Sequence, residues 1–448
     1  MEKIKLALKN TSQTKELLLG EGVIVRTAAV FEKLFPGQKA IIIADKTTFG
    51  IAGNDVHMLL AKNGIAQEEP YIFDEHALHA EWNYIERLDK RLSETDAIPI
   101  ATGSGTINDL VKLSATHTRR PYITVATAAS MDGYASYGAS ITKDGAKQTF
   151  PCHAPKAIIA DIDVIATAPA EMTAAGYADL FAKIPAGADW ILADALGVEP
   201  IDALAFSIVQ DGLHQALDNP SGVREGNRDA LRNLTEGLML GGFAMQAYPQ
   251  SSRPASGAEH QFSHLWDMEN FVMRNGAAPS HGFKVSIGTL VSIAFYEQLL
   301  RSDLKKLDVE ACVKAWPTAA EAESKAIELF KGTNFPTIGL TETKAKYITH
   351  DELRQQLTRF KNTWEVTKER LRNQLIPVDE AVRRLDTVGA PVTPEQIDLS
   401  RQKLKESIIP AQHLRRRFTI LDIAVRTGLI NEWMAGLFGK GGLWEINR

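Results

Sequence analysis

Hydrophobic and polar positions alternate in two different ways along this chain, and the change comes near residue 169. Up to that point, short runs rich in β-branched residues alternate with stretches of helical spacing. The pattern predicts strands at 40–44, 71–73, 97–101, 122–126 and 157–160, and helices at 56–62, 81–92 and 107–115. Such alternation predicts a mostly parallel, Rossmann-like sheet with helices on both faces.

Residues 140–160 interrupt this alternation. The turn signal Lys-Asp-Gly-Ala at 143–146 lies between two polar–apolar segments and predicts a β-hairpin. From Glu171 onward, β-branched runs become rare, and Ala, Leu, Glu, Lys and Arg dominate with helical spacing. We therefore expect an α/β domain over residues 1–169 and an all-α domain over residues 170–448, with the active site in the cleft between them.

Composition narrows the functional classes. A chain of 448 residues is long enough for two domains. Its formal charge of -5 gives no polybasic surface, so we expect neither nucleic acid nor an anionic membrane as a partner. Two cysteines and a start without a signal-peptide pattern favour a cytoplasmic protein. No apolar run approaches the roughly 18 residues that a membrane span needs.

A glycine-rich segment, Thr-Gly-Ser-Gly-Thr-Ile-Asn-Asp at 102–109, follows a predicted strand and opens a predicted helix. Glycines let the backbone approach a pyrophosphate, and a helix N-terminus supplies free N–H groups. The segment does not match GxGxxG, and a simple tight turn is the alternative. Its candidate cofactor-binding residues are Gly103, Ser104, Gly105, Thr106, Ile107, Asn108 and Asp109.

Two further strand ends support a nucleotide site. The small residues Thr127, Ala128, Ala129 and Ser130 end one strand, at a place where a ligand could lie. Asp45 ends an earlier strand, where an acid can accept hydrogen bonds from a ribose diol and weakly disfavours a 2′-phosphate.

Histidines in the second half suggest a metal site. His260 and His264 are four residues apart, so a helix would place them on one face. His281 begins another predicted helix, and Asp179 lies in the earlier segment Gly-Tyr-Ala-Asp-Leu. Imidazole and carboxylate ligands suit a divalent metal that keeps positions open for a substrate. A surface or capping role is the alternative for each of these residues.

In their order along the chain, these segments resemble the iron-containing alcohol dehydrogenase superfamily, which also includes glycerol dehydrogenases and dehydroquinate synthases. The similarity runs over roughly residues 15–430 and is greatest to its sn-glycerol-1-phosphate dehydrogenase branch. The motifs that carry it are Gly-Ser-Gly-Thr-Ile-Asn-Asp at 103–109, Thr-Ala-Ala-Ser-Met-Asp-Gly at 127–133, Asp-Leu at 179–180, Ser-Gly-Ala-Glu-His at 256–260, His264 and His-Gly at 281–282.

The resemblance implies roles by position. Residues 105–109 and 127–130, with Ser136, would hold NAD(P). Asp179, His260 and His281 would bind one divalent metal per subunit, zinc or nickel, while Asp132, Asp179 and His264 would act on the substrate. The implied reaction is the reversible reduction of dihydroxyacetone phosphate to sn-glycerol 1-phosphate. Members of the family often form homodimers, so a homodimer is expected.

Two other enzymes on the same scaffold stay open. One is a dehydrogenase for an unphosphorylated polyol such as glycerol, because no phosphate site is identified. Arg253 and Lys284 flank the histidine segments and are candidates for it, although structural ion pairs are their more common role. The other is a dehydroquinate-synthase-like cyclase, which typically has Glu where this chain has Asp179. A protein that has lost its activity would lack ligands, and none is missing here.

Overall fold

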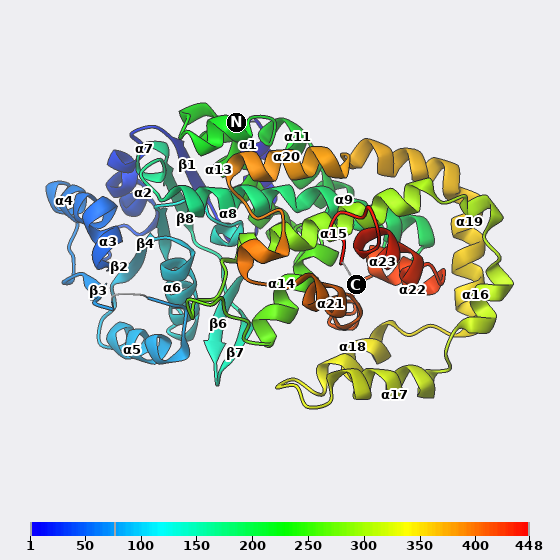
Figure 1. Cartoon of the computed structure of the whole chain (residues 1–448). Coiled ribbons are helices and arrows are strands. Elements are labelled where there is room, and N and C mark those ends of the chain that lie inside the picture. Colours follow the sequence, from blue (N-terminus) through cyan, green and yellow to red (C-terminus); the bar gives the residue numbers. More distant parts are fainter. Residues whose placement is uncertain (1, 76–77, 447–448) are drawn as a thin grey trace. The chain divides into compact units, whose positions relative to one another are not determined.

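The strands predicted in the first third of the chain pair in one parallel sheet (Figure 1). The computed structural model describes residues 2–75 and 78–446, and within them this sheet has six strands in the order β1-β8-β5-β4-β2-β3. The predicted strands are confirmed, and β1 is an addition. The bounds are β1 (Glu16–Gly20), β2 (Ala40–Asp45), β3 (Tyr71–Phe73), β4 (Ile98–Gly103), β5 (Ile123–Ala126) and β8 (Ala157–Asp161).

The strand order places a ligand crevice at the C-terminal edge of the sheet. After β2 the chain adds β3 on one side, and it then returns to place β4 on the other side of β2. Asp45 ends β2 and Gly103 ends β4, so the two residues border the point where the strand order reverses. Ligands of open α/β sheets bind in such a crevice.

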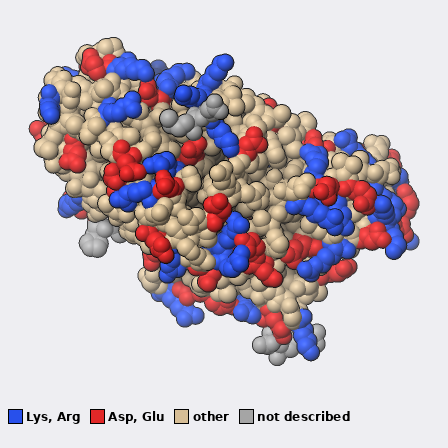
Figure 2. Space-filling view, turned by 90° about the horizontal axis from the view of Figure 1, so that it is seen from above, with Lys and Arg blue, Asp and Glu red and all other residues tan. Residues whose placement is uncertain are grey.

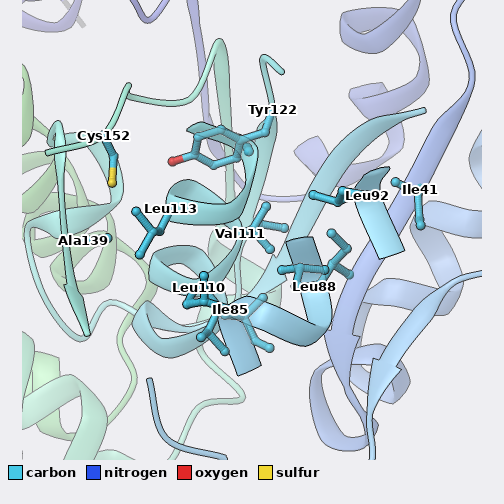
Figure 3. Packing of buried hydrophobic residues seen from close by; sticks show 14 of the residues in the cluster. Ile41, Ile85, Leu88, Leu92, Leu110, Val111, Leu113, Tyr122, Ala139 and Cys152 are labelled. Atoms are coloured by element: carbon cyan, nitrogen blue, oxygen red, sulfur yellow. The ribbon is translucent and has the colours of Figure 1, made fainter. Parts of the chain in front are cut away.

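Buried side chains fill both faces of the sheet. In β2, Ile41 and Ile43 belong to one hydrophobic core and Ile42 to the other, as the alternation of a strand requires. The core of Ile41 also contains residues of α5 (Trp82–Ser93) and α6 (Gly105–His117), among them Leu88 and Leu110 (Figure 3). The other core receives residues of α2 (Thr27–Leu34) and α4 (Asn54–Lys62).

The predicted hairpin is confirmed. Strands β6 (Gly138–Lys143) and β7 (Ala146–Pro151) pair antiparallel, and Lys143 pairs with Ala146 across the turn. Asp144 and Gly145 both have positive φ, 52° and 74°, as a two-residue hairpin turn requires.

Two compact units divide the chain. The first consists of Met1–Leu180 and Ser207–Ser252, and the second of Phe181–Phe206 and Arg253–Arg448. The predicted boundary between residues 169 and 170 follows the last strand, and as a domain boundary it stays a prediction. The first unit's further helices are α1 (Glu2–Asn10), α3 (Lys46–Thr48), α7 (Ile162–Ile165), α8 (Ala170–Phe181) without its last residue, α11 (Leu213–Ala216), α12 (Pro220–Arg224) and α13 (Arg228–Ala247).

In the part of the second unit that the structure describes, the chain forms helices and the loops that join them, as the all-α pattern predicts for this region. Its α10 (Ala203–Gln210) continues into the first unit. The other helices are α9 (Lys183–Leu196), α14 (Ala258–Met268), α15 (His281–Arg301), α16 (Val309–Ala315), α17 (Ala319–Phe330), α18 (Ile338–Lys346), α19 (His350–Gln374), α20 (Val378–Val388), α21 (Arg401–His413), α22 (Ile420–Arg426) and α23 (Ile430–Phe438).

The surface agrees with the charge composition. Figure 2 shows acidic and basic side chains interspersed over the face in view. Several form exposed ion pairs, such as Arg354 with Glu310 and Asp351. Among the described residues, no helix combines the length and the apolar character that crossing a membrane demands.

Candidate active site

The glycine loop joins β4 to α6 and leaves the N-terminus of α6 open. Ser104 is the N-cap residue, and its side chain makes no capping hydrogen bond. The first N–H groups of a helix have no partner within it, and Ser104, Gly105 and Thr106 are half-buried rather than enclosed. A Cβ on Gly105 would lie 2.6 Å from Met131 Cε, the end of a flexible side chain that packs against this loop. The loop therefore fits an anionic group such as a pyrophosphate.

The later residues of the loop make internal contacts. Ile107 is buried and packs against Gly103. A Cβ on Gly103 would lie 2.6 Å from the Ile107 side chain. Asn108 Oδ1 accepts from Tyr122 Oη at 3.5 Å, and Asp109 Oδ2 accepts from the Ser140 N–H at 3.1 Å. Burial raises the pKa of Asp109 above its usual value. These contacts hold α6 in place, and direct contact of these residues with a dinucleotide stays a prediction.

The segment 127–130 lies beside the glycine loop. The Thr127 N–H donates to Gly103 O at 3.1 Å, which ties the end of β5 to the end of β4. Thr127, Ala128 and Ala129 are buried, while Ser130 is half-buried. The predicted nucleotide segments are thus brought together at one edge of the sheet.

Asp45 caps α3 at the end of β2. Its Oδ1 accepts from the Thr48 N–H at 2.8 Å, and the side chain remains half-buried. Within the described residues, Oδ2 has no hydrogen-bond partner, so one carboxylate oxygen remains for a ligand hydroxyl.

Ser136 lies in a loop held by a buried lysine. Lys112 of α6 donates from Nζ to Gly133 O at 2.6 Å and to Gly138 O at 2.9 Å, and Nζ lies 3.4 Å from Ser136 Oγ. Ser136 Oγ donates to Gly133 O at 3.1 Å. Lys112 was not anticipated from the sequence, because a lysine within a helix is usually exposed.

Asp179 is fully buried in α8, and the loop that contains Asp132 orients it. The Asp132 N–H donates to Asp179 Oδ2 at 2.9 Å. Gly176 lets α8 approach that loop, because a Cβ there would lie 1.8 Å from Ala129 O. The metal-ligand candidate Asp179 and the substrate-facing candidate Asp132 are therefore neighbours.

The three candidate histidines lie together in the second unit. His260 and His264 are on α14, and His281 begins α15, whose N-cap Ser280 accepts from the Phe283 N–H at 3.3 Å. The ring centroids of His260 and His281 are 5.2 Å apart. The ring centroid of His264 lies 6.4 Å from that of His260 and 6.3 Å from that of His281. A ring nitrogen of His260 and one of His281 lie within 4.8 Å of each other.

Neighbouring side chains orient two of these rings. His260 Nδ1 lies 2.8 Å from Glu259 Oε1, and His281 Nδ1 lies 3.2 Å from Ser263 Oγ. Each contact engages Nδ1, so Nε2 would be the nitrogen that binds a metal. The two imidazoles therefore suit a divalent metal, for which histidine nitrogens are common ligands.

A buried carboxyl that the sequence did not indicate supports the start of α14. Asp189 of α9 accepts from the Ala258 N–H at 2.8 Å, the Ile420 N–H at 2.8 Å and Tyr296 Oη at 2.6 Å. Burial, followed by the charge of Glu259, raises the pKa of Asp189 to about 7. An Asp in a helix gives no local signal of such a role.

The two candidate phosphate ligands make internal ion pairs. Arg253 is 1% exposed and donates to Phe418 O and Asp189 O, both at 2.8 Å, and its Nε lies 3.3 Å from a Glu199 carboxylate oxygen. Lys284 is likewise 1% exposed and pairs with Asp267. Both residues therefore form structural ion pairs, which was the alternative to a phosphate-binding role in the sequence analysis.

Comparison with known proteins gives two sequence findings. The family model described as iron-containing alcohol dehydrogenase matches residues 18–169. Over 384 residues the chain is 30% identical to a glycerol-1-phosphate dehydrogenase [NAD(P)+] of Halalkalibacterium halodurans, covering 85% of this chain and 84% of that one. It is 32% identical to the enzyme of the same name from Methanosarcina acetivorans, covering 65% of this chain and 80% of that one.

Solved structures share the fold. A glycerol dehydrogenase from Schizosaccharomyces pombe superposes with a TM-score of 0.59 at 15% identity, covering 95% of this chain and 90% of that one. An NADH-dependent butanol dehydrogenase from Thermotoga maritima gives 0.57 at 15% identity, covering 94% and 96%. At these identities the likeness concerns the fold alone.

Proposed function

We propose that this chain, which belongs to the glycerol-1-phosphate dehydrogenase family of the iron-containing alcohol dehydrogenases, reduces dihydroxyacetone phosphate to sn-glycerol 1-phosphate with NADH or NADPH. The single observation that best supports a metal-dependent reaction is the pair His260 and His281, with both Nδ1 atoms engaged by neighbours and ring nitrogens within 4.8 Å.

The metal ligands that we propose are Asp179, His260 and His281, one carboxylate and two imidazoles. When bound there, a divalent metal supplies Lewis-acid polarisation of the ketone oxygen. Zinc or nickel suits this donor set, and we propose one ion per chain. The Asp132 N–H would orient Asp179, and the Ser263 hydroxyl would orient His281.

The cofactor would lie across the C-terminal edge of the sheet. Residues 103–109 would receive the pyrophosphate at the open N-terminus of α6, and residues 127–130 and Ser136 would line the rest of the site. Asp45 would accept hydrogen bonds from the adenosine ribose through its remaining carboxylate oxygen. The nicotinamide supplies the hydride, and these residues supply its placement.

Proton transfer would complete the reaction. Reduction of the ketone consumes one hydride and one proton, and the proton goes to the carbonyl oxygen. His264 is the donor that we propose, because imidazole titrates near neutral pH and its ring is half-buried beside the other two histidines. The Asp132 carboxylate would hold the hydroxyl group of the substrate.

The test is a substrate comparison. Protein stripped of metal receives zinc or nickel, NADH or NADPH, and either dihydroxyacetone phosphate or dihydroxyacetone, and loss of reduced nicotinamide is followed. Metal-dependent turnover of the phosphorylated ketone, with a product that an enzyme specific for sn-glycerol 3-phosphate rejects, is expected. Turnover of dihydroxyacetone alone would indicate a polyol dehydrogenase. No turnover of either ketone would favour the cyclase or a protein without catalytic activity.

Assembly and location belong to the same proposal. We propose a cytoplasmic homodimer, on the strength of the family resemblance and of a composition with two cysteines. Light scattering coupled to gel filtration would test the assembly. A mass near twice the 49.2 kDa of one chain is expected, and a mass near one chain would refute the dimer.

A further inference from the structure

Glu259 is a fully buried carboxylate to which the proposed chemistry gives no catalytic step. It directly precedes His260 at the start of α14. A buried charge is costly unless hydrogen bonds compensate for it, so its contacts indicate why the position is acidic.

Those contacts link Glu259 to a ligand of the proposed metal. Oε1 accepts from the Gly257 N–H at 2.6 Å and lies 2.8 Å from His260 Nδ1. A hydrogen bond from Nδ1–H to a carboxylate fixes the tautomer of an imidazole and makes its other nitrogen more basic. For His260, that other nitrogen is Nε2.

We propose that Glu259 is a positioning residue for the metal: it holds the His260 ring in one orientation and one tautomer, so that Nε2 is a preorganised ligand. The inference rests on the proposed metal site and extends it, because it assigns part of the metal affinity to a residue that does not touch the ion.

The surroundings hold the Glu259 side chain in place. A Cβ at Gly257 would lie 2.9 Å from Glu259 Oε2 and 2.4 Å from Asp189 Oδ2, so glycine makes room for both carboxyls. A Cβ at Gly288 would lie 2.4 Å from Glu259 O, which brings α15 directly against this residue. Asp189, in turn, is fixed by Tyr296 and two backbone N–H groups. Because Glu259 is fully buried in this packed region, its side chain has little room to adopt another rotamer.

The second histidine ligand provides an internal comparison. His281 Nδ1 faces the neutral hydroxyl of Ser263 at 3.2 Å, whereas His260 Nδ1 faces a charged acceptor at 2.8 Å. Charge-assisted hydrogen bonds are roughly twice as strong as neutral ones. Loss of Glu259 should therefore weaken metal binding more than loss of the Ser263 hydroxyl.

The experiment measures metal affinity rather than turnover. Wild type, Glu259→Gln, Glu259→Ala and the matched control Ser263→Ala are titrated with Zn²⁺ in competition with a chromophoric chelator. Each is also loaded with Co²⁺ for its visible spectrum. Glu259→Ala should lose about 10- to 100-fold in affinity, the usual range for such partners of metal ligands. Glu259→Gln, which keeps the shape and an acceptor oxygen, should lose less, and Ser263→Ala the least. The Co²⁺ spectrum should change in Glu259→Ala.

Two results would overturn the inference. One is wild-type Zn²⁺ affinity and an unchanged Co²⁺ spectrum in both Glu259 variants. If His260→Ala still loses the metal in that case, the proposed metal site remains and only the role of Glu259 is refuted. The other is a wild type that binds no metal, or a His260→Ala variant that keeps it, which would remove the metal site itself. If Glu259→Ala does not fold, as circular dichroism would show, Glu259→Gln against Ser263→Ala decides.

Discussion

Gly176→Ala is a small change that should disturb the proposed site without replacing any residue that we propose to bind the metal or the cofactor. The added Cβ would lie 1.8 Å from Ala129 O, 2.7 Å from Ala129 C and 3.1 Å from Ser130 Cα, all of them backbone atoms. A comfortable carbon–oxygen contact is about 3.3 Å, so α8 and the 127–130 segment must separate by about 1.5 Å. Overpacking of this kind costs about 1–3 kcal/mol, and helix propensity returns about 1 kcal/mol.

Separation of α8 from the 127–130 segment should move Asp179 relative to the loop that contains Asp132. Asp179 is three residues beyond Gly176 on α8, on the same face, and accepts from the Asp132 N–H. Misplacement of reacting groups by about 1 Å can cost about 100-fold in rate, so we expect a loss of that order in kcat/KM. A modest fall in thermal stability should accompany it.

The assay combines thermal unfolding, NADH binding and turnover of dihydroxyacetone phosphate. Gly50→Ala is the matched control: it lies in the helical segment η2 (Phe49–Gly53), it is exposed, and nothing lies within 4 Å of its Cβ position. The control should keep wild-type stability and activity. Wild-type behaviour of Gly176→Ala in all three measurements would refute the close approach of α8 to this loop.

Two other substitutions test separate parts of the account. Asp45→Asn keeps an oxygen that can cap α3 but removes the charge that would repel a 2′-phosphate. The ratio of kcat/KM for NADPH to that for NADH should therefore rise about 5- to 10-fold, as removal of about 1 kcal/mol of repulsion implies, and an unchanged ratio would place the ribose elsewhere. Asp189 has a folded-state pKa raised from 3.8 to about 7, so its contribution to stability is full below pH 3.8 and is lost as pH rises toward 7. Between pH 5 and pH 8 this loss of unfolding free energy is at most about 3 kcal/mol. Urea unfolding of Asp189→Asn should show a pH dependence that lacks this loss. Parallel pH profiles for wild type and Asp189→Asn would contradict this.

Local pattern was enough to predict much of the fold. The β-branched runs at Ile41–Ile43 and Ile158–Ile159 are buried on both sides, so their composition alone marks them as strands. The Asp144-Gly145 pair marks the hairpin because few residues accept positive φ at both turn positions. By contrast, β1 was not predicted: Leu17–Leu19 is a short run without β-branched residues, and it becomes a strand because β8 pairs with it.

In the candidate site, too, local sequence pattern could predict some relations between residues and not others. His260 and His264 could be related from the sequence, because a four-residue spacing has a geometric meaning on a helix. Glu259 was visible as part of a motif, but its role depends on the contacts of its carboxyl group with the Gly257 N–H and His260 Nδ1. Asp189 is 69 residues from Ala258, whose N–H it accepts, and Lys112 acts on a loop more than 20 residues away. No local periodicity encodes such contacts.

Metal stoichiometry would show whether Asp179, His260 and His281 hold one divalent metal, as we propose. Wild type and the single variants Asp179→Ala, His260→Ala, His281→Ala and His264→Ala are dialysed against Zn²⁺ with weak chelator, and metal per chain is measured by atomic emission, with circular dichroism to confirm folding. We expect about one ion per chain in wild type and in His264→Ala, and a large loss of metal in each of the other three variants. Full metal content in any folded variant of Asp179, His260 or His281 would contradict it.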